Sequence, residues 1–157
     1  LRDINPDAEL HPVHGLYDAA HRDCFFPEGC RYDYIVDAID LVSCKLDLAE
    51  TARRLNIPLM MALGTGNKLD PSQLRLADIS ETYGCPLARV MRKELRNRGI
   101  CRQPVVFSPE QPAPTTQREA PPPGRRSVPA SNPWVPAVAG LLIGSKVVRD
   151  LIANKGV

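Results

Sequence analysis

Residues 57–100 read IPLMMALGTGNKLDPSQLRLADISETYGCPLARVMRKELRNRGI, and this segment decides the fold. Its apolar start, PLMMAL at residues 58–63, is typical of a strand that is buried on both faces of a parallel sheet. The strand is expected to end in a Gly64-Thr65-Gly66 turn, which a second turn at residues 69–71 follows. Residues 73–79 then alternate polar and apolar side chains, which predicts a half-exposed strand.

A strongly basic helix is predicted at the end of the segment. It begins near Pro86, because proline is tolerated at a first helical position. Leu87, Met91 and Leu95 form one apolar face, and Gly99 ends the helix. Residues 104–108, PVVFS, predict one more short strand beyond it.

The residues before this segment complete a strand-helix-strand unit. Residues 33–39, DYIVDAI, predict a short buried strand that ends at Asp40. From Leu41 the apolar positions recur at spacings of three and four, which predicts an amphipathic helix that ends near Asn56. Because such a unit is right-handed and covered on both faces, we expect an α/β fold, with a Rossmann-like, mostly parallel sheet and flanking helices.

The chain is expected to organise into three parts. Residues 1–108 form the sheet domain. Residues 109–133 hold eight prolines, a composition that cannot bury enough apolar surface to order itself, so they predict a mobile loop. Residues 134–157 predict a helix that packs on the same domain. The uncharged run of this helix ends at Lys146, short of the ~20 residues that cross a bilayer, so a membrane role is not expected. Its small residues are expected to allow close packing against a sheet or a second helix; they are Ala137, Ala139, Gly140 and Gly144.

Composition and charge point to a globular protein with one basic region. Hydrophobic residues make up 43% of the chain and charged residues 24%, which is ordinary for a soluble domain. The net charge of +2 hides an uneven spread, because residues 85–102 carry six Lys or Arg against the single Glu94. The five cysteines form no CxxC pair, which predicts reduced thiols in the cytoplasm and no zinc site.

Asp40 is the first candidate for a functional side chain. A carboxylate at the carboxyl end of a parallel strand points into the crevice where doubly wound folds bind ligands. Its oxygens suit Mg²⁺ held against a triphosphate. The alternative is that Asp40 only caps the helix that starts at Leu41. Asp37, inside the apolar run, is expected to be a structural carboxylate that binds backbone amides.

Two further candidates follow the second strand. The amides of the Gly64-Thr65-Gly66 turn are suited to an oxyanion or to a substrate tail that passes close to the backbone. The alternative is a tight turn at a strand exit. Cys85 stands at the start of the basic helix, where the helix dipole and nearby cations favour a thiolate. The alternative is a buried, inert cysteine.

The basic helix is a candidate surface for a phosphate backbone. A solvated amphipathic helix is the alternative, because no aromatic side chains interleave for base stacking. The basic residues away from its apolar face are Arg89, Arg92, Lys93, Arg96 and Arg98.

Taken together, these motifs resemble bacterial members of the ThiF/MoeB/HesA superfamily, the ubiquitin-activating-enzyme-like adenylating proteins, and within it the tRNA threonylcarbamoyladenosine dehydratase branch. The resemblance is strongest from about Tyr34 to Ile100. It implies that the chain is the C-terminal portion of an adenylation domain, since LRDINPDAEL at the start reads as mid-domain sequence and the family's glycine-rich nucleotide motif is not found. The chain alone is therefore expected not to turn over ATP.

The resemblance also implies roles for the candidate residues. Asp40 would contact Mg²⁺ and ATP, Lys45 would approach the phosphates, and residues 64–66 would form the adenylate pocket. The basic helix would bind tRNA through Arg89, Arg92, Lys93 and Arg96. Resembling dehydratases use a cysteine just before the C-terminal helix, where this chain has about Pro129.

The implied reaction is ATP-dependent adenylation of a carboxylate, followed by dehydration and cyclisation of threonylcarbamoyladenosine in tRNA. Two alternatives stay open. One is adenylation of the C-terminus of a ubiquitin-like sulfur-carrier protein, and the other is a non-catalytic remnant that binds nucleic acid or protein. A homodimer is expected, because superfamily members usually dimerise and a shortened sheet leaves an open edge.

Overall fold

The computed structural model describes residues 1–114, 120 and 129–154. Most of the predicted proline-rich loop, residues 115–119 and 121–128, lies outside the described residues, as do residues 155–157. The chain divides into two compact units, Leu1–Arg31 and Tyr32–Val157. Within the described ranges no helix combines the length and the hydropathy that a bilayer crossing needs.

The smaller unit is mostly irregular and contains one short helix, α1 (Arg22–Phe25). The Tyr17 ring packs edge-on against Phe25, with ring centroids 5.3 Å apart. The carboxylate of Asp18 accepts the His21 amide hydrogen at 2.9 Å and lies 2.8 Å from the imidazole Nδ1. His21 thus has a local structural contact.

The larger unit is built on a four-stranded sheet with the order β1-β2-β4-β3. β1 (Ile35–Asp37), β2 (Leu59–Ala62) and β4 (Pro104–Phe107) run parallel, and β3 (Arg75–Asp78) pairs antiparallel with β4 at one edge. The predicted α/β fold with a mostly parallel sheet is confirmed. Because the carboxyl ends of β1, β2 and β4 meet at one edge, the turns that follow them are brought together.

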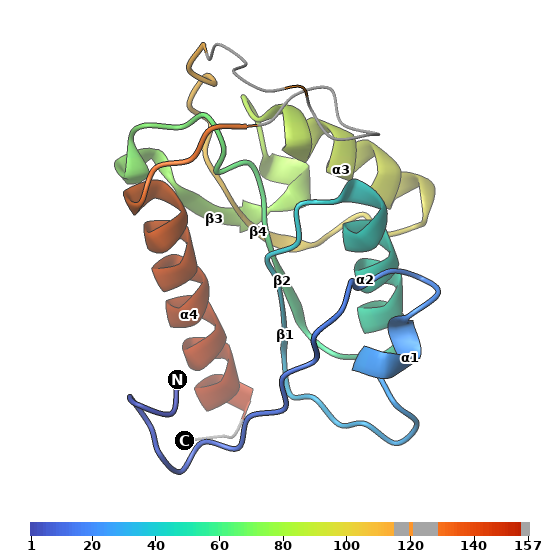
Figure 1. Cartoon of the computed structure of the whole chain (residues 1–157). Coiled ribbons are helices and arrows are strands. Elements are labelled where there is room, and N and C mark those ends of the chain that lie inside the picture. Colours follow the sequence, from blue (N-terminus) through green and yellow to red (C-terminus); the bar gives the residue numbers. More distant parts are fainter. Residues whose placement is uncertain (115–119, 121–128, 155–157) are drawn as a thin grey trace. The chain divides into compact units, whose positions relative to one another are not determined.

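Helices cover both faces of this sheet (Figure 1). α2 (Val42–Leu55) and α3 (Pro86–Asn97) lie on one face, and α4 (Trp134–Asn154) lies on the other. Pro86 starts α3 as predicted.

The predicted strand over residues 73–79 is shorter than expected at both ends. Asp70 accepts a hydrogen bond from the Ser72 amide and begins the 3-10 turn η1 (Pro71–Gln73). Asp78 accepts from the Ser80 amide in the same way and begins η2 (Ile79–Glu81). The aspartate side chains accept hydrogen bonds from nearby backbone amides, which therefore do not pair with a neighbouring strand. Only four residues remain for β3.

α4 packs on the sheet through one stripe. Val135, Ala139 and Ile143 are buried against Met60 and Val106 of the sheet. The prediction that four small residues allow close packing is wrong for three of them. Ala137, Gly140 and Gly144 are exposed, and a Cβ at either glycine would meet nothing within 4 Å. The buried stripe recurs every four residues from position 135, so these positions point away from the sheet.

Candidate functional site

A cavity of about 610 Å³ opens at the carboxyl edge of the parallel strands. It is lined by the turn after β1, the first turns of α2, the turn after β2, the start of α3, and short stretches on either side of the proline-rich segment. Six residues that sequence patterns single out lie on its wall. They are Asp40, Lys45, Gly64, Thr65, Gly66 and Cys85.

Asp40 lies three residues beyond β1 rather than at the strand end. β1 ends at Asp37, because Oδ1 of Asp37 accepts a hydrogen bond from the Ile39 amide at 2.9 Å and turns the chain. The predicted strand end at Asp40 is therefore wrong. The alternative role as a helix cap is also wrong, because Leu41 holds the N-cap position of α2. Asp40 instead lines the cavity.

Lys45 reaches the cavity from the second turn of α2, and only 1% of its surface is exposed. Its Nζ donates to Oδ2 of Asp37 at 2.9 Å and to the carbonyl oxygen of Ala62 at 2.8 Å. Burial lowers the pKa of the Lys45 ammonium below its usual range, and the carboxylates of Asp37 and Asp40 oppose that shift. Through these two contacts the Lys45 ammonium ties the end of β1 to the end of β2 at the cavity wall.

Asp37 is fully buried by these contacts. Its carboxylate binds the Ile39 amide, as the structural role predicted for it requires, and in addition holds the Lys45 ammonium. The partnership with Lys45 was not foreseen from the sequence. A carboxylate and a lysine eight positions apart are brought together only when the helix folds back along the strand.

The sulfur atom of Cys85 lies so close to the backbone at position 64 that only glycine fits there. Gly64 has φ +60°, and a Cβ built on it would stand 2.3 Å from Sγ of Cys85. Cys85 is 4% exposed, occupies the N-cap position of α3, and accepts the Ala88 amide hydrogen at 3.5 Å. The thiol therefore forms part of the cavity wall and begins the helix. A catalytic role for it stays a prediction.

The chemistry of the cavity wall fits Mg²⁺ only together with an oxygen-rich ligand. Asp40 is the one carboxylate among the described residues that line the cavity. No group of three or more His, Cys, Asp or Glu in the described part of the chain is placed to hold a metal ion. One carboxylate combined with phosphate oxygens is nevertheless a common arrangement for Mg²⁺. Asp40 is therefore a fitting ligand for a phosphate-bound metal and not for a metal held by protein alone.

α3 carries its basic residues on the side away from Met91 and Leu95, which are buried. Arg89, Lys93 and Arg96 are exposed and recur every three to four positions, so they share one face of the helix.

Arg92 differs from these three. It is half-buried, and its Nη1 donates to the carbonyl and hydroxyl oxygens of Thr82. Its guanidinium therefore braces the turn that precedes α3. A hollow of about 320 Å³ lies beside it, and this hollow shares Cys85 and Pro86 with the larger cavity.

Sequence patterns missed Asn67 and Lys68, which also line the cavity. Asn67 has φ +57°, and its side-chain Oδ1 accepts the Ala130 amide hydrogen at 2.6 Å. Lys68 is 2% exposed and donates to the carbonyl oxygen of Glu110. The signal available in the sequence was the Asn after Gly66, since asparagine is enriched at positive φ.

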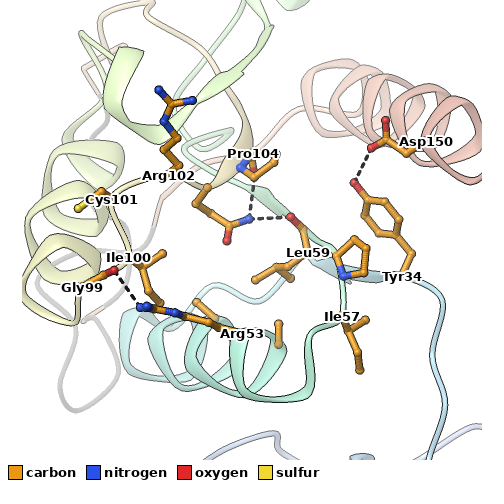
Figure 2. Close-up of a pocket in the computed structure, with 14 residues that line it drawn as sticks. Tyr34, Arg53, Ile57, Leu59, Gly99, Ile100, Cys101, Arg102, Pro104 and Asp150 are labelled. Atoms are coloured by element: carbon orange, nitrogen blue, oxygen red, sulfur yellow. Dashed lines mark hydrogen bonds between the residues drawn. The ribbon is translucent and has the colours of Figure 1, made fainter. Parts of the chain in front are cut away.

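A second cavity, of about 560 Å³, lies at the opposite, amino edge of the same strands (Figure 2). Three of its polar side chains, Tyr34, Arg53 and Gln103, donate to other groups of the protein. Tyr34 Oη donates to Asp150 at 2.9 Å, and Arg53 Nη1 donates to the carbonyl oxygen of Gly99 at 2.8 Å (Figure 2). Gln103 Nε2 donates to the carbonyl oxygen of Leu59 at 2.6 Å.

Known proteins are similar to this chain in sequence and in fold. No protein-family model matches the chain. It is 36% identical over 163 residues to the tRNA threonylcarbamoyladenosine dehydratase of Bacillus subtilis (strain 168), which covers 98% of this chain and 63% of the relative. It is 33% identical over 97 residues to the dehydratase of Escherichia coli (strain K12), which covers 62% of this chain and 35% of the relative.

Solved structures of the E. coli dehydratase match the fold. The complexes with ATP and with AMP give TM-scores of 0.79 and 0.80, at 27% and 26% sequence identity. Each match covers 98% of this chain and 61% of the solved chain. The chain therefore spans about three fifths of the length of the B. subtilis relative and of the E. coli structures.

Proposed function

Because this chain belongs to the family of the tRNA threonylcarbamoyladenosine dehydratases, we propose that the protein activates a carboxylate with ATP and that this carboxylate belongs to threonylcarbamoyladenosine in tRNA. One observation carries the proposal. Five residues from separate segments of the sequence, to which the resemblance assigns adenylation roles, line one cavity at the carboxyl edge of the sheet. That edge is where doubly wound folds bind their ligands.

Asp40 and Lys45 are the residues proposed to handle the triphosphate. Asp40 would hold Mg²⁺, which neutralises charge on the phosphates when the α-phosphate is attacked. Lys45 has three ammonium protons, of which two are donated to Asp37 and Ala62. The third is available to a phosphate oxygen in the cavity, and the fixed geometry means that no reorganisation is needed to donate it.

The turn at residues 64–66 is proposed to accommodate the adenylated carboxyl group. The missing side chains of Gly64 and Gly66 leave room for Cys85 and Pro129, and the turn would bind the ligand through its backbone amides. Thr65 lines the same wall and adds a hydroxyl group. The acyl group would then react with the neighbouring carbamoyl nitrogen of the substrate, and AMP would leave.

α3 is proposed to bind the tRNA backbone. Its exposed basic face consists of Arg89, Lys93 and Arg96. Arg89 also lines the hollow that shares Cys85 and Pro86 with the cavity, so one end of the basic face lies near the site. Arg92 is not part of this surface, because its guanidinium donates hydrogen bonds to Thr82. Contacts with phosphates would make the binding sensitive to salt.

The proposed function is tested with the gene-encoded protein, including whatever residues adjoin this chain. The protein is incubated with ATP, Mg²⁺ and tRNA that carries threonylcarbamoyladenosine, and the nucleoside is analysed by mass spectrometry. We expect loss of one water from the nucleoside, together with release of AMP and pyrophosphate. Matched tRNA without the modification should give neither product.

Two results would contradict the proposal. If pyrophosphate exchange occurs with a ubiquitin-like sulfur-carrier protein and not with the modified tRNA, the substrate is that carrier protein and not the tRNA. Absence of exchange with both would exclude carboxylate adenylation and leave a protein that only binds nucleic acid or protein.

A further inference from the structure

The loop that follows the Gly64-Thr65-Gly66 turn holds two distant segments of the chain. These are residues 110–113, which follow β4, and residues 129–134, which lead into α4. Both segments are hydrogen-bonded to residues 67–70. The loop is therefore the point at which both segments are anchored.

Asn67 makes three of these bonds. Its amide donates to the carbonyl oxygen of Ala130 at 2.8 Å, and its Oδ1 accepts the Ala130 amide hydrogen at 2.6 Å. Its carbonyl oxygen accepts the Ala113 amide hydrogen at 2.7 Å. The φ of +57° at Asn67 is the conformation in which these bonds form. Asparagine adopts it more readily than most residues.

Neighbouring residues reinforce the anchor. The Glu110 carboxylate accepts the amide hydrogens of Leu69 at 3.0 Å and of Asp70 at 3.1 Å. Asn132 Nδ2 donates to the carbonyl oxygen of Lys68 at 2.6 Å.

The anchored segments form the outer wall of the cavity. Pro112, Pro129, Ala130 and Ser131 line it and are exposed to solvent on their other side. A Cβ built on Gly66 would stand 2.8 Å from Cβ of Pro129, so the wall is in direct contact with the turn. These residues form one side of the cavity, which opens to solvent elsewhere.

We propose that Asn67 is a positioning residue that holds this outer wall in place and so limits the access of water, so that an acyl-adenylate formed in the cavity proceeds to product and is not hydrolysed. The inference rests on the proposed function, because it assumes an acyl-adenylate. In the reaction that the wall prevents, water attacks the acyl carbon, the bond from that carbon to the phosphate oxygen breaks, and free carboxylate and AMP result. Exclusion of water from a reactive intermediate is a general role of closed sites.

Two substitutions distinguish the contribution of the Asn67 side chain from that of its backbone conformation. Asn67→Gly permits the positive φ and removes the acceptor for the Ala130 amide. Asn67→Asp keeps an acceptor oxygen and also tolerates positive φ. Asn56→Gly is the matched control, because Asn56 has φ +55° at the end of α2 and does not line the cavity.

The first measurement is hydrogen exchange at the Ala113 and Ala130 amides of the gene-encoded protein without ligand. One hydrogen bond contributes about 1 kcal/mol, so Asn67→Gly should speed exchange at Ala130 by roughly fivefold. Asn67→Asp and Asn56→Gly should match the wild-type protein. Unchanged exchange in Asn67→Gly would overturn the anchoring role whatever the protein's activity is.

The second measurement is the ratio of AMP released to tRNA product formed. Asn67→Gly should raise this ratio at least severalfold, and Asn67→Asp should restore it. A purely structural defect would lower AMP and product in parallel and leave the ratio unchanged, which would overturn the proposal. A wild-type protein that forms neither AMP nor product would contradict the proposed function instead, and the exchange measurement would then decide on the anchor alone.

Discussion

The two edges of the parallel sheet carry cavities of similar size and opposite character. The cavity at the carboxyl edge has a volume of about 610 Å³, and its lining includes a carboxylate, a buried ammonium group and a glycine turn. At the amino edge, about 560 Å³ is lined largely by apolar side chains, and Tyr34, Arg53 and Gln103 each donate to other groups of the protein (Figure 2).

Under the proposed function the carboxyl-edge cavity is the site, and the similar volumes of the two cavities do not distinguish it. Tyr34, Arg53 and Gln103 hold the start of β2, the end of α3 and α4 in place, so the hydrogen-bonding capacity of these three side chains serves the fold. At the carboxyl edge, the Lys45 ammonium donates to Asp37 and Ala62, and the proposed function assigns its third proton to a ligand. Hydrogen-bonding capacity that the fold leaves available is therefore the better criterion.

The largest expected effect on stability comes from the buried ion pair at the carboxyl edge. Lys45→Met leaves the Asp37 carboxylate buried without its counter-ion, so the free energy of unfolding should fall by about 3–5 kcal/mol. Urea unfolding followed by circular dichroism measures this loss. The double variant Asp37→Leu with Lys45→Met should recover part of it, because no buried charge is left unpaired.

Lys146→Met is the matched control near the amino edge. It breaks the Lys146–Asp150 pair, whose partners are one turn apart on α4 and about one third exposed. The expected loss is below about 1 kcal/mol. Equal losses in the two variants would contradict the contrast between the edges.

A smaller effect is expected from Tyr34 at the amino edge. Burial, together with the hydrogen bond to Asp150 and the charge of that carboxylate, raises the pKa of the Tyr34 hydroxyl from 10.0 to about 12. The unfolded chain therefore loses this proton near pH 10, and the folded protein keeps it to about pH 12. The stabilisation is complete below pH 10 and is lost as the pH rises through 12.

Tyr34→Phe should therefore destabilise the protein at about pH 9 by no more than about 1 kcal/mol, because solvent screens a partly exposed group. The difference from the wild-type protein should shrink as the pH approaches the folded-state pKa. Unfolding midpoints in urea across this pH range measure it, with the exposed Tyr83→Phe as the control. A difference that stays constant with pH would show that the pKa of the Tyr34 hydroxyl is not raised in the folded protein.

Much of the fold and the composition of the cavity wall could be predicted from sequence. The apolar runs and the helical spacing between them define a strand-helix-strand unit, and parallel strands bring their carboxyl ends to one edge. That rule alone brings Asp40 and residues 64–66 to one edge, whereas Cys85 follows the antiparallel strand β3 and reaches the cavity only through the start of α3.

What could not be predicted depends on contacts between distant residues. The strand ends at Asp37 and not at Asp40 because of hydrogen bonds to Ile39 and Lys45. Asn67 acquires its partners, Ala113 and Ala130, only after the chain has returned to the cavity from β4 and before α4. The orientation of α4 could not be predicted from sequence either. Apolar residues lie all round this helix, so periodicity does not select the stripe that faces the sheet.

The most direct test of the central claim is pyrophosphate exchange by the gene-encoded protein carrying Asp40→Asn, with Asp150→Asn at the amino edge as the matched control. If Asp40 holds the metal at the carboxyl-edge cavity, exchange should fall by at least about a hundredfold, while Asp150→Asn should remain within about twofold of the wild-type rate. Circular dichroism spectra and urea midpoints would confirm that both variants are folded. A folded Asp40→Asn protein that retains wild-type exchange would contradict the assignment of the carboxyl-edge cavity as the adenylation site.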